Sequence, residues 1–182
     1  MPETGSIGAD SDATAWPAAI HAALTAHGVR QVAYVPDAGH RTLIELCRAD
    51  PAMTAVPLTT EEEGVALLAG AWLGGERGAL LMQSSGLGNC INMLSLTKVC
   101  RFPLLMLLTM RGEWAEANPW QVPMGQITED LLRTTDVLRF RAEQATEVGA
   151  VVDAAARMAF EGSAAAAVVI AQRLIGAKTF DG

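Results

Sequence analysis

Short apolar runs alternate along this chain with segments whose apolar residues recur at helical spacing. The strongest run, FPLLMLLTM at 102–110, is almost unbroken, which is typical of a strand buried on both faces of a sheet. Strands that alternate with helices favour a parallel sheet with helices on both sides. The pattern therefore predicts an α/β fold, a three-layer αβα arrangement with a mostly parallel six-stranded sheet.

Several predicted elements are marked by particular residues. Gly28 follows the first helical segment, where glycine commonly ends helices, and Pro57 gives its strand an edge or irregular position. The stretch SSGLGN at 84–89 is predicted to be a tight loop, and 111–125 a connection long enough to suggest a function. Strands are expected at 29–36, 53–59, 78–83, 102–110, 136–141 and 164–171, and helices at 16–27, 40–50, 62–73, 90–100, 126–135 and 145–162.

Length and composition favour one folded domain. The chain has 182 residues, of which 51% are apolar, enough for a proper core. Residues 1–12 are acidic and polar and are predicted to be a disordered leader, with the folded domain at 13–178. The leader lacks the charged and apolar regions of a signal peptide, and no apolar run reaches membrane-spanning length.

Charge and cysteine content exclude several classes of protein. The net charge is −7 and no basic cluster is present, which argues against binding to nucleic acid or to an anionic membrane. Cys47, Cys90 and Cys100 are odd in number and have no CxxC spacing, so we expect buried thiols in a reducing cytoplasm. No set of His, Cys, Asp or Glu has the spacing of metal ligands.

Polar residues follow four of the predicted strands. These segments are VPDAGH (35–40), TTEEE (59–63), MQSSGLGN (82–89) and MRGEWAEANPWQVP (110–123). The carboxyl ends of parallel strands meet at one edge of a sheet, which is where ligand crevices form. The sequence therefore places the candidate site at that edge.

Three consecutive glutamates, Glu61, Glu62 and Glu63, head an apolar run. Thr60 and Glu63 have the spacing of a capping box, and acidic residues suit the positive end of a helix dipole. Glu61, however, lies at the junction of strand and helix. From the residues alone two interpretations stay open: all three cap the helix, or Glu61 binds a ligand.

The glycine-rich stretch and a histidine are further candidates. Glycines allow close approach of a ligand and helix-start amides attract anions, whereas Ser84, Ser85 and Asn89 can equally serve as capping groups. His40 is a candidate acid, base or anion ligand, and the alternative is a cap or a surface residue.

Arg111 ends the strongest strand. A guanidinium there can hold a carboxylate, sulfonate or phosphonate through a bidentate pair, and the alternative is an ion pair with Glu113 or Glu116. Trp114 and Trp120 can wall a cleft or bury an interface with another chain.

Three segments, EEEGVALLAGAWLGG, LLMQSSGLGN and RGE…NPWQVPMGQ, resemble the pyrimidine-binding domain of thiamine-diphosphate enzymes. Within that family the chain is similar, over roughly residues 15–175, to the α subunit of sulfopyruvate decarboxylase and to the N-terminal domain of phosphonopyruvate decarboxylase. The resemblance implies the thiamine-diphosphate-binding fold. It also implies decarboxylation of a small 2-oxo acid, with sulfopyruvate giving sulfoacetaldehyde and CO2.

The resemblance also implies roles for individual residues. In this family a glutamate precedes a helical glycine by nine residues, and counting back from Gly70 gives Glu61. Glu61 would then hydrogen-bond a ring nitrogen of the aminopyrimidine and help to form the ylid nucleophile. The other matching positions are Pro36, Asp37, Gln83, Ser85, Gly86, Leu87 and Asn89 for the cofactor, and His40, Ser84, Arg111, Trp120 and Gln121 for the substrate.

One motif of the family is absent. Such enzymes bind the diphosphate and a divalent metal through a GDG followed by an asparagine, and this sequence has no GDG. The resemblance therefore implies a β subunit that holds the diphosphate and Mg²⁺, in a hetero-oligomer such as α2β2 or larger. Two other functions stay open: carboligation by the same chemistry, and a non-catalytic αβ module, against which the acidic residue Glu61 argues.

Overall fold

All six strands run parallel in one sheet, in the order β2-β1-β3-β4-β6-β5. The computed structural model describes residues 15–176, so the leader predicted at 1–12 lies outside the described part. The parallel six-stranded sheet predicted from the alternation is confirmed. The strands are β1 (Val29–Tyr34), β2 (Thr54–Pro57), β3 (Arg77–Gln83), β4 (Leu104–Thr109), β5 (Leu138–Ala142) and β6 (Ala165–Ile170).

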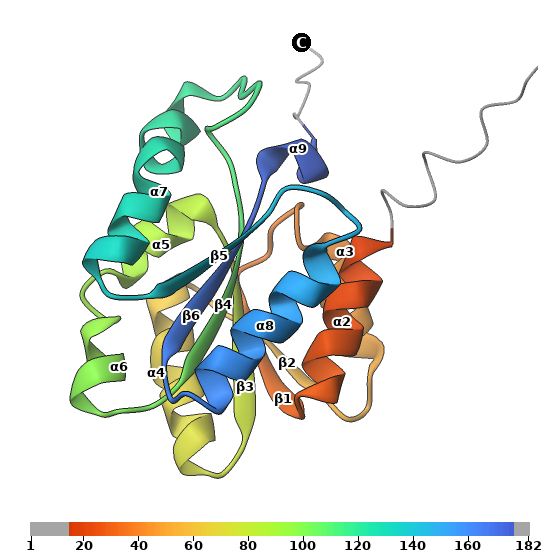
Figure 1. Cartoon of the computed structure of the whole chain (residues 1–182), viewed down its shortest axis with the longest axis vertical. Helices are drawn as coiled ribbons and strands as arrows, with labels where there is room; N and C mark the ends of the chain where they lie inside the picture. Colours follow the sequence, from red (N-terminus) through yellow and green to blue (C-terminus); the bar gives the residue numbers. More distant parts are fainter. Residues whose placement is uncertain (1–14, 177–182) are drawn as a thin grey trace, which may run out of the picture.

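Helices cover both faces of the sheet, as predicted (Figure 1). One layer holds α2 (Trp16–Ala26), α3 (Arg41–Ala49) and α8 (Val148–Phe160), and the other holds α4 (Glu61–Leu73), α5 (Ser84–Cys90), α6 (Ser95–Val99) and α7 (Val122–Thr134). Two short elements complete the described part of the chain, the 3-10 helix η1 (Pro119–Gln121) and α9 (Gln172–Ile175). Among the described helices, none has both the length and the apolar character needed to span a bilayer.

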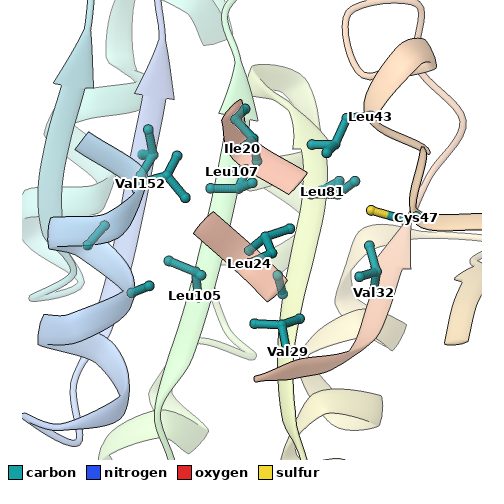
Figure 2. Close-up of a cluster of buried hydrophobic side chains, with 14 of the residues drawn as sticks. Ile20, Leu24, Val29, Val32, Leu43, Cys47, Leu81, Leu105, Leu107 and Val152 are labelled. Carbon is teal, nitrogen blue, oxygen red and sulfur yellow. The ribbon is translucent and has the colours of Figure 1, made fainter. Parts of the chain in front are cut away.

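The central strand β4 is buried along its whole length, as its apolar run predicted. Successive side chains of a strand point to opposite faces, so β4 contributes to two cores. Figure 2 shows the core under α2 and α8, where Leu105 and Leu107 lie with Ile20, Leu24 and Val152. The alternate residues of β4 pack in the core on the other face: Leu104, Met106 and Leu108.

The strand order reverses beside β1. From β1 the chain runs to the edge strand β2 and then returns across β1 to β3. In α/β sheets such a switch point opens a crevice at the carboxyl ends of the strands. The residues after β1 and at the end of β3 meet there, since Gln83 Nε2 donates a hydrogen bond to Asp37 Oδ1 (3.1 Å).

The predicted tight loop at 84–89 is wrong, because these residues form helix α5. Glycine favours loops when judged by propensity alone, but here it serves close packing between helices. A Cβ on Gly86 would collide with Glu61 of α4. The single helix expected at 90–100 is also wrong, since α5 ends at Cys90 and α6 begins only at Ser95.

Two smaller predictions also differ from the structure. Helix α7 begins at Val122 rather than near residue 126, because Pro123 fits the first turn of a helix. Cys100 is exposed, whereas Cys47 and Cys90 are buried as predicted. Burial raises the pKa of Cys47 to about 11 and that of Cys90 to about 12, so both buried thiols stay protonated at neutral pH.

Two glycines of α4 provide a matched test of this packing. A Cβ on Gly64 would lie 2.8 Å from Leu58 Cδ1 and would also meet the buried Leu80, whereas a Cβ on Gly70 meets nothing within 4 Å. We expect Gly64→Ala to lower the free energy of unfolding by about 1–2 kcal/mol through overpacking. Gly70→Ala should raise it by up to about 1 kcal/mol through helix propensity. Urea unfolding of both variants measures the difference, and shifts of the same sign would contradict this packing.

Candidate functional site

Glu61 is the first residue of α4, yet its side chain is buried, with only 8% of the residue exposed. The carboxylate lies against the backbone of α5, where Gly86 leaves room for it. Asn89 Nδ2 donates a hydrogen bond to Glu61 Oε2 at 2.7 Å. Among the described residues this is the only hydrogen bond to the carboxylate, so Oε1 keeps its capacity to accept another.

A cleft of about 840 Å³ opens beside this carboxylate. One wall belongs to α4 and α5, and the other, largely apolar, belongs to η1 and the start of α7. Trp120 stands at the rim with 83% of its surface exposed. The lining residues are Glu61, Ser85, Gly86, Gly88, Asn89, Pro119, Trp120, Pro123 and Met124.

The capping interpretation holds for only part of the glutamate triplet. Thr60 makes no side-chain capping hydrogen bond, so the predicted capping box does not form. Glu63 instead accepts a hydrogen bond from Thr59 N (2.9 Å) with its side chain exposed to solvent. Glu61 therefore differs from Glu63 in surroundings as well as in position.

A second polar group lies at the switch point and centres on Asp37. Its Oδ2 accepts hydrogen bonds from Thr109 Oγ1 (2.7 Å) and Gly39 N (3.0 Å), and its Oδ1 accepts one from Gln83 Nε2. Ser85 Oγ donates to Gln83 Oε1 at 2.8 Å. Since Ser85 lines the cleft, a continuous hydrogen-bonded chain connects the cleft wall to Asp37.

Arg111 forms the ion pair that the sequence left as an alternative. Its Nε and Nη2 donate to the two carboxylate oxygens of Glu116, both at 2.6 Å, and both side chains are almost completely buried. The guanidinium holds the pKa of Glu116 down, at about 2. Arg111 also lines a small cavity of about 100 Å³ together with Asp37, Gly39 and Thr109.

The remaining predicted site residues lie away from the cleft or contribute no side chain to it. His40 is fully buried with Nε2 at 3.0 Å from Leu107 O, and burial lowers its pKa. Ser84 is buried and its Oγ accepts a hydrogen bond from Arg111 N (3.1 Å), and Leu87 packs in the core. Pro36 lines a separate groove beside α3, and Gln121 ends η1.

The sequence analysis missed four lining residues and one anchor. Gly88, Pro119, Pro123 and Met124 line the cleft, and Gln172, which begins α9 just after β6, is fully buried in a polar network. A polar residue directly after a strand was the available signal for Gln172. Between residues 15 and 176, no group of three or more His, Cys, Asp or Glu side chains could hold a metal ion.

Comparison with known proteins identifies the family. The family model described as "Thiamine pyrophosphate enzyme, N-terminal TPP binding domain" matches residues 17–130. The chain belongs to the thiamine pyrophosphate enzymes. The family resemblance drawn from the sequence is thus confirmed (thiamine pyrophosphate and thiamine diphosphate are the same compound).

Individual members of the family extend this likeness. Sulfopyruvate decarboxylase subunit alpha of Methanococcus maripaludis is 42% identical over 123 residues, which cover 67% of this chain and 74% of that protein. Phosphonopyruvate decarboxylase of Streptomyces viridochromogenes is 43% identical over 118 residues, 64% of this chain but only 30% of that protein.

A solved structure supports the fold. The 2-oxoglutarate:ferredoxin oxidoreductase of Magnetococcus marinus superposes with a TM-score of 0.74 at 14% identity, over 92% of this chain and 33% of that one. At this identity the likeness concerns the fold alone.

The Arg111–Glu116 pair predicts a specific acid sensitivity. Because the folded pKa of Glu116 is about 2, against an ordinary value of 4.5, its carboxylate stabilises the fold fully above pH 4.5 and loses that effect as the pH falls toward 2. At pH 7 we expect Glu116→Gln to be less stable than wild type by about 3 kcal/mol, a gap that closes on acidification. Denaturant unfolding at pH 7, 4 and 3 measures it, and a gap independent of pH would contradict the assignment.

Proposed function

We propose that this chain is the α subunit of a two-subunit, thiamine diphosphate-dependent 2-oxo acid decarboxylase that converts sulfopyruvate to sulfoacetaldehyde and CO2. The likeness to the Methanococcus maripaludis subunit supports the reaction and the division into subunits. Phosphonopyruvate is the second candidate substrate, supported by the similarity to phosphonopyruvate decarboxylase. The observation that carries the proposal is the buried carboxylate of Glu61 at the wall of a largely apolar cleft.

The cleft fits the aminopyrimidine of thiamine diphosphate. Glu61 Oε1 is free of other donors among the described residues and can accept a hydrogen bond from a protonated ring nitrogen. Pro119, Trp120 and Met124 provide an apolar wall for a flat ring. When bound, the cofactor supplies a carbon nucleophile for the 2-oxo group and an electron sink for the bond to the departing CO2.

The residues of this chain then have distinct tasks. Glu61 holds at Oε1 the proton that it shares with the ring, and a carboxylate in that position favours protonation of the ring nitrogen. Asn89 fixes Oε2 and so gives the carboxylate one orientation. Gly86 permits the close approach of α5, and the apolar wall excludes water, which strengthens the hydrogen bond.

We assign the diphosphate and Mg²⁺ to a β subunit in a cytoplasmic hetero-oligomer such as α2β2. The lack of a GDG motif in this sequence supports that assignment. The exposed Trp120 at the rim of the cleft also supports it, because tryptophan is enriched where proteins associate.

The acidic tail of the substrate requires a cation, and we assign it to the β subunit as well. Glu116 occupies the Nε–Nη2 edge of the Arg111 guanidinium, and Arg111 is not among the residues that line the cleft. The described lining of the cleft contains one acidic residue and no Lys, Arg or His. We therefore assign Arg111 to holding the loop that leads to the cleft wall, through Glu116, rather than to binding the substrate tail.

The decisive variant is Glu61→Gln. The chain is mixed with thiamine diphosphate, Mg²⁺ and a β subunit that carries GDG…N, such as one encoded by a neighbouring reading frame, and sulfopyruvate, phosphonopyruvate and pyruvate are offered. We expect decarboxylation only with both chains and a loss of at least about 100-fold in Glu61→Gln, because an amide is a far weaker proton acceptor.

The matched control is Glu63→Gln, two residues away on the same helix. Its amide oxygen can still accept the hydrogen bond from Thr59 N, and its side chain faces solvent. The control should retain wild-type activity. Equal activity of the Glu61 and Glu63 variants, or no turnover of any acid by wild type, would favour a non-catalytic αβ module instead.

Gly86→Ala tests the close approach that shapes the cleft. The added Cβ would collide with the Glu61 carboxylate and push it out of place. We expect the KM for thiamine diphosphate to rise about tenfold or more and kcat to fall as well, since the ring and its proton acceptor no longer align. Steady-state kinetics against cofactor concentration measure both, and an unchanged KM and kcat would show that Glu61 does not touch the cofactor.

A further inference from the structure

The side chain of Gln172 fastens the segment between β4 and η1 to the chain just after β6. This residue is fully buried and begins α9. Its Oε1 accepts hydrogen bonds from Glu113 N and Trp114 N, both at 3.0 Å, and its Nε2 donates to Glu116 Oε2 at 2.9 Å. In return, Gln172 N donates to Glu113 Oε1 at 2.7 Å. The amide thus makes three of its four possible hydrogen bonds to one loop.

The Glu116 carboxylate connects Gln172 to other residues of the loop. Besides Gln172 it accepts hydrogen bonds from Arg111, from Gly112 N (3.2 Å) and from Asn118 N (3.0 Å). These donors lie before and after Glu116 in the chain. The carboxylate therefore sets the path of the loop in both directions.

Between the anchored positions the backbone takes a conformation that it does not favour by itself. Ala115 has φ of +48°, in the left-handed region, where a side chain with a Cβ is strained. Such a residue persists when its surroundings over-determine it. Gln172 binds Trp114 N on one side of Ala115 and the Glu116 carboxylate on the other.

The anchored loop leads directly to the cofactor cleft. Asn118, held at its backbone N by Glu116, accepts a hydrogen bond from Trp120 N on its side-chain Oδ1 (3.1 Å). Trp120 lines the cleft opposite Glu61. A continuous set of hydrogen bonds therefore runs from Gln172 through Glu116 and Asn118 to the cleft wall.

We propose that Gln172 is a positioning residue for the cofactor cleft: it fixes the strained loop in the one conformation that places the η1 wall opposite Glu61. The inference rests on the proposed function for its kinetic consequences. Without the anchor the loop samples other conformations, and the apparent affinity for the cofactor is the intrinsic affinity multiplied by the fraction of molecules that keep the wall in place.

Two substitutions separate positioning from simple packing. Gln172→Met keeps a side chain of similar length but removes every side-chain hydrogen bond. Gln172→Glu, when protonated, can accept from the two backbone N–H groups and donate to Glu116, as the amide does. When ionised it opposes Glu116 and the nearby Glu113, with Arg111 and Arg141 already paired to those two residues. The anchor should therefore work at low pH and fail as the pH rises through the pKa of the introduced carboxyl group.

In the α–β complex we expect Gln172→Met to raise the KM for thiamine diphosphate about tenfold, with kcat at saturating cofactor within about twofold of wild type. Gln172→Glu should show a near-normal KM at low pH and a raised KM at high pH. The matched controls are Gln144→Met and Gln144→Glu, at an exposed position after β5, which should behave as wild type at every pH.

Hydrogen–deuterium exchange of the isolated chain measures how often the loop opens, without cofactor or substrate. Peptides that contain Gly112, Glu113 and Trp114 should exchange at least about tenfold faster in Gln172→Met than in wild type. Unchanged exchange, or faster exchange with an unchanged KM, would overturn the positioning role. If wild type decarboxylates no acid, the proposed function fails, and KM is replaced by direct titration of the complex with thiamine diphosphate.

Discussion

The parallel direction of all six strands is the constraint on which the site depends. Both faces of the sheet are covered by helices, so only the edge where the strands end is available for polar groups that must meet a ligand. The segments after β1, β2, β3, β4 and β6 all arrive at this edge. Residues far apart in sequence therefore meet at this edge, Gln83 with Asp37 and Gln172 with Glu116.

Two buried glutamates lie at this edge, and they differ in how many hydrogen bonds they accept. That number distinguishes a carboxylate that holds the loop from one that can bind a ligand. Glu116 accepts five hydrogen bonds from four residues, which leaves it no further capacity and lowers its pKa to about 2. Glu61 accepts one, from Asn89, among the described residues, although it is also buried. A buried acceptor with unused capacity beside a cleft is suited to a ligand, whereas a saturated one shapes the loop around it.

The sequence predicted the architecture but not the detail of the polar contacts. Strand β4 was predictable because a strand buried on both faces needs an apolar side chain at almost every position. The helix of residues 84–90 was not, because Gly86 is explained only by the approach of Glu61, and Gly88 by that of Met124, which are tertiary contacts. The choice between substrate and Glu116 as partner of Arg111 also depended on the path of the loop, which Gln172 sets from a distant part of the chain.

The proposed function requires Glu61 to receive the aminopyrimidine of thiamine diphosphate in the cleft between α5 and η1. A crystal structure of the chain with its β subunit and the cofactor tests this most directly. We expect a ring nitrogen within hydrogen-bond distance of Glu61 Oε1, with Asn89 still on Oε2 and Arg111 still paired with Glu116. A cofactor ring elsewhere, or a Glu61 carboxylate turned away from it toward solvent, would contradict the account.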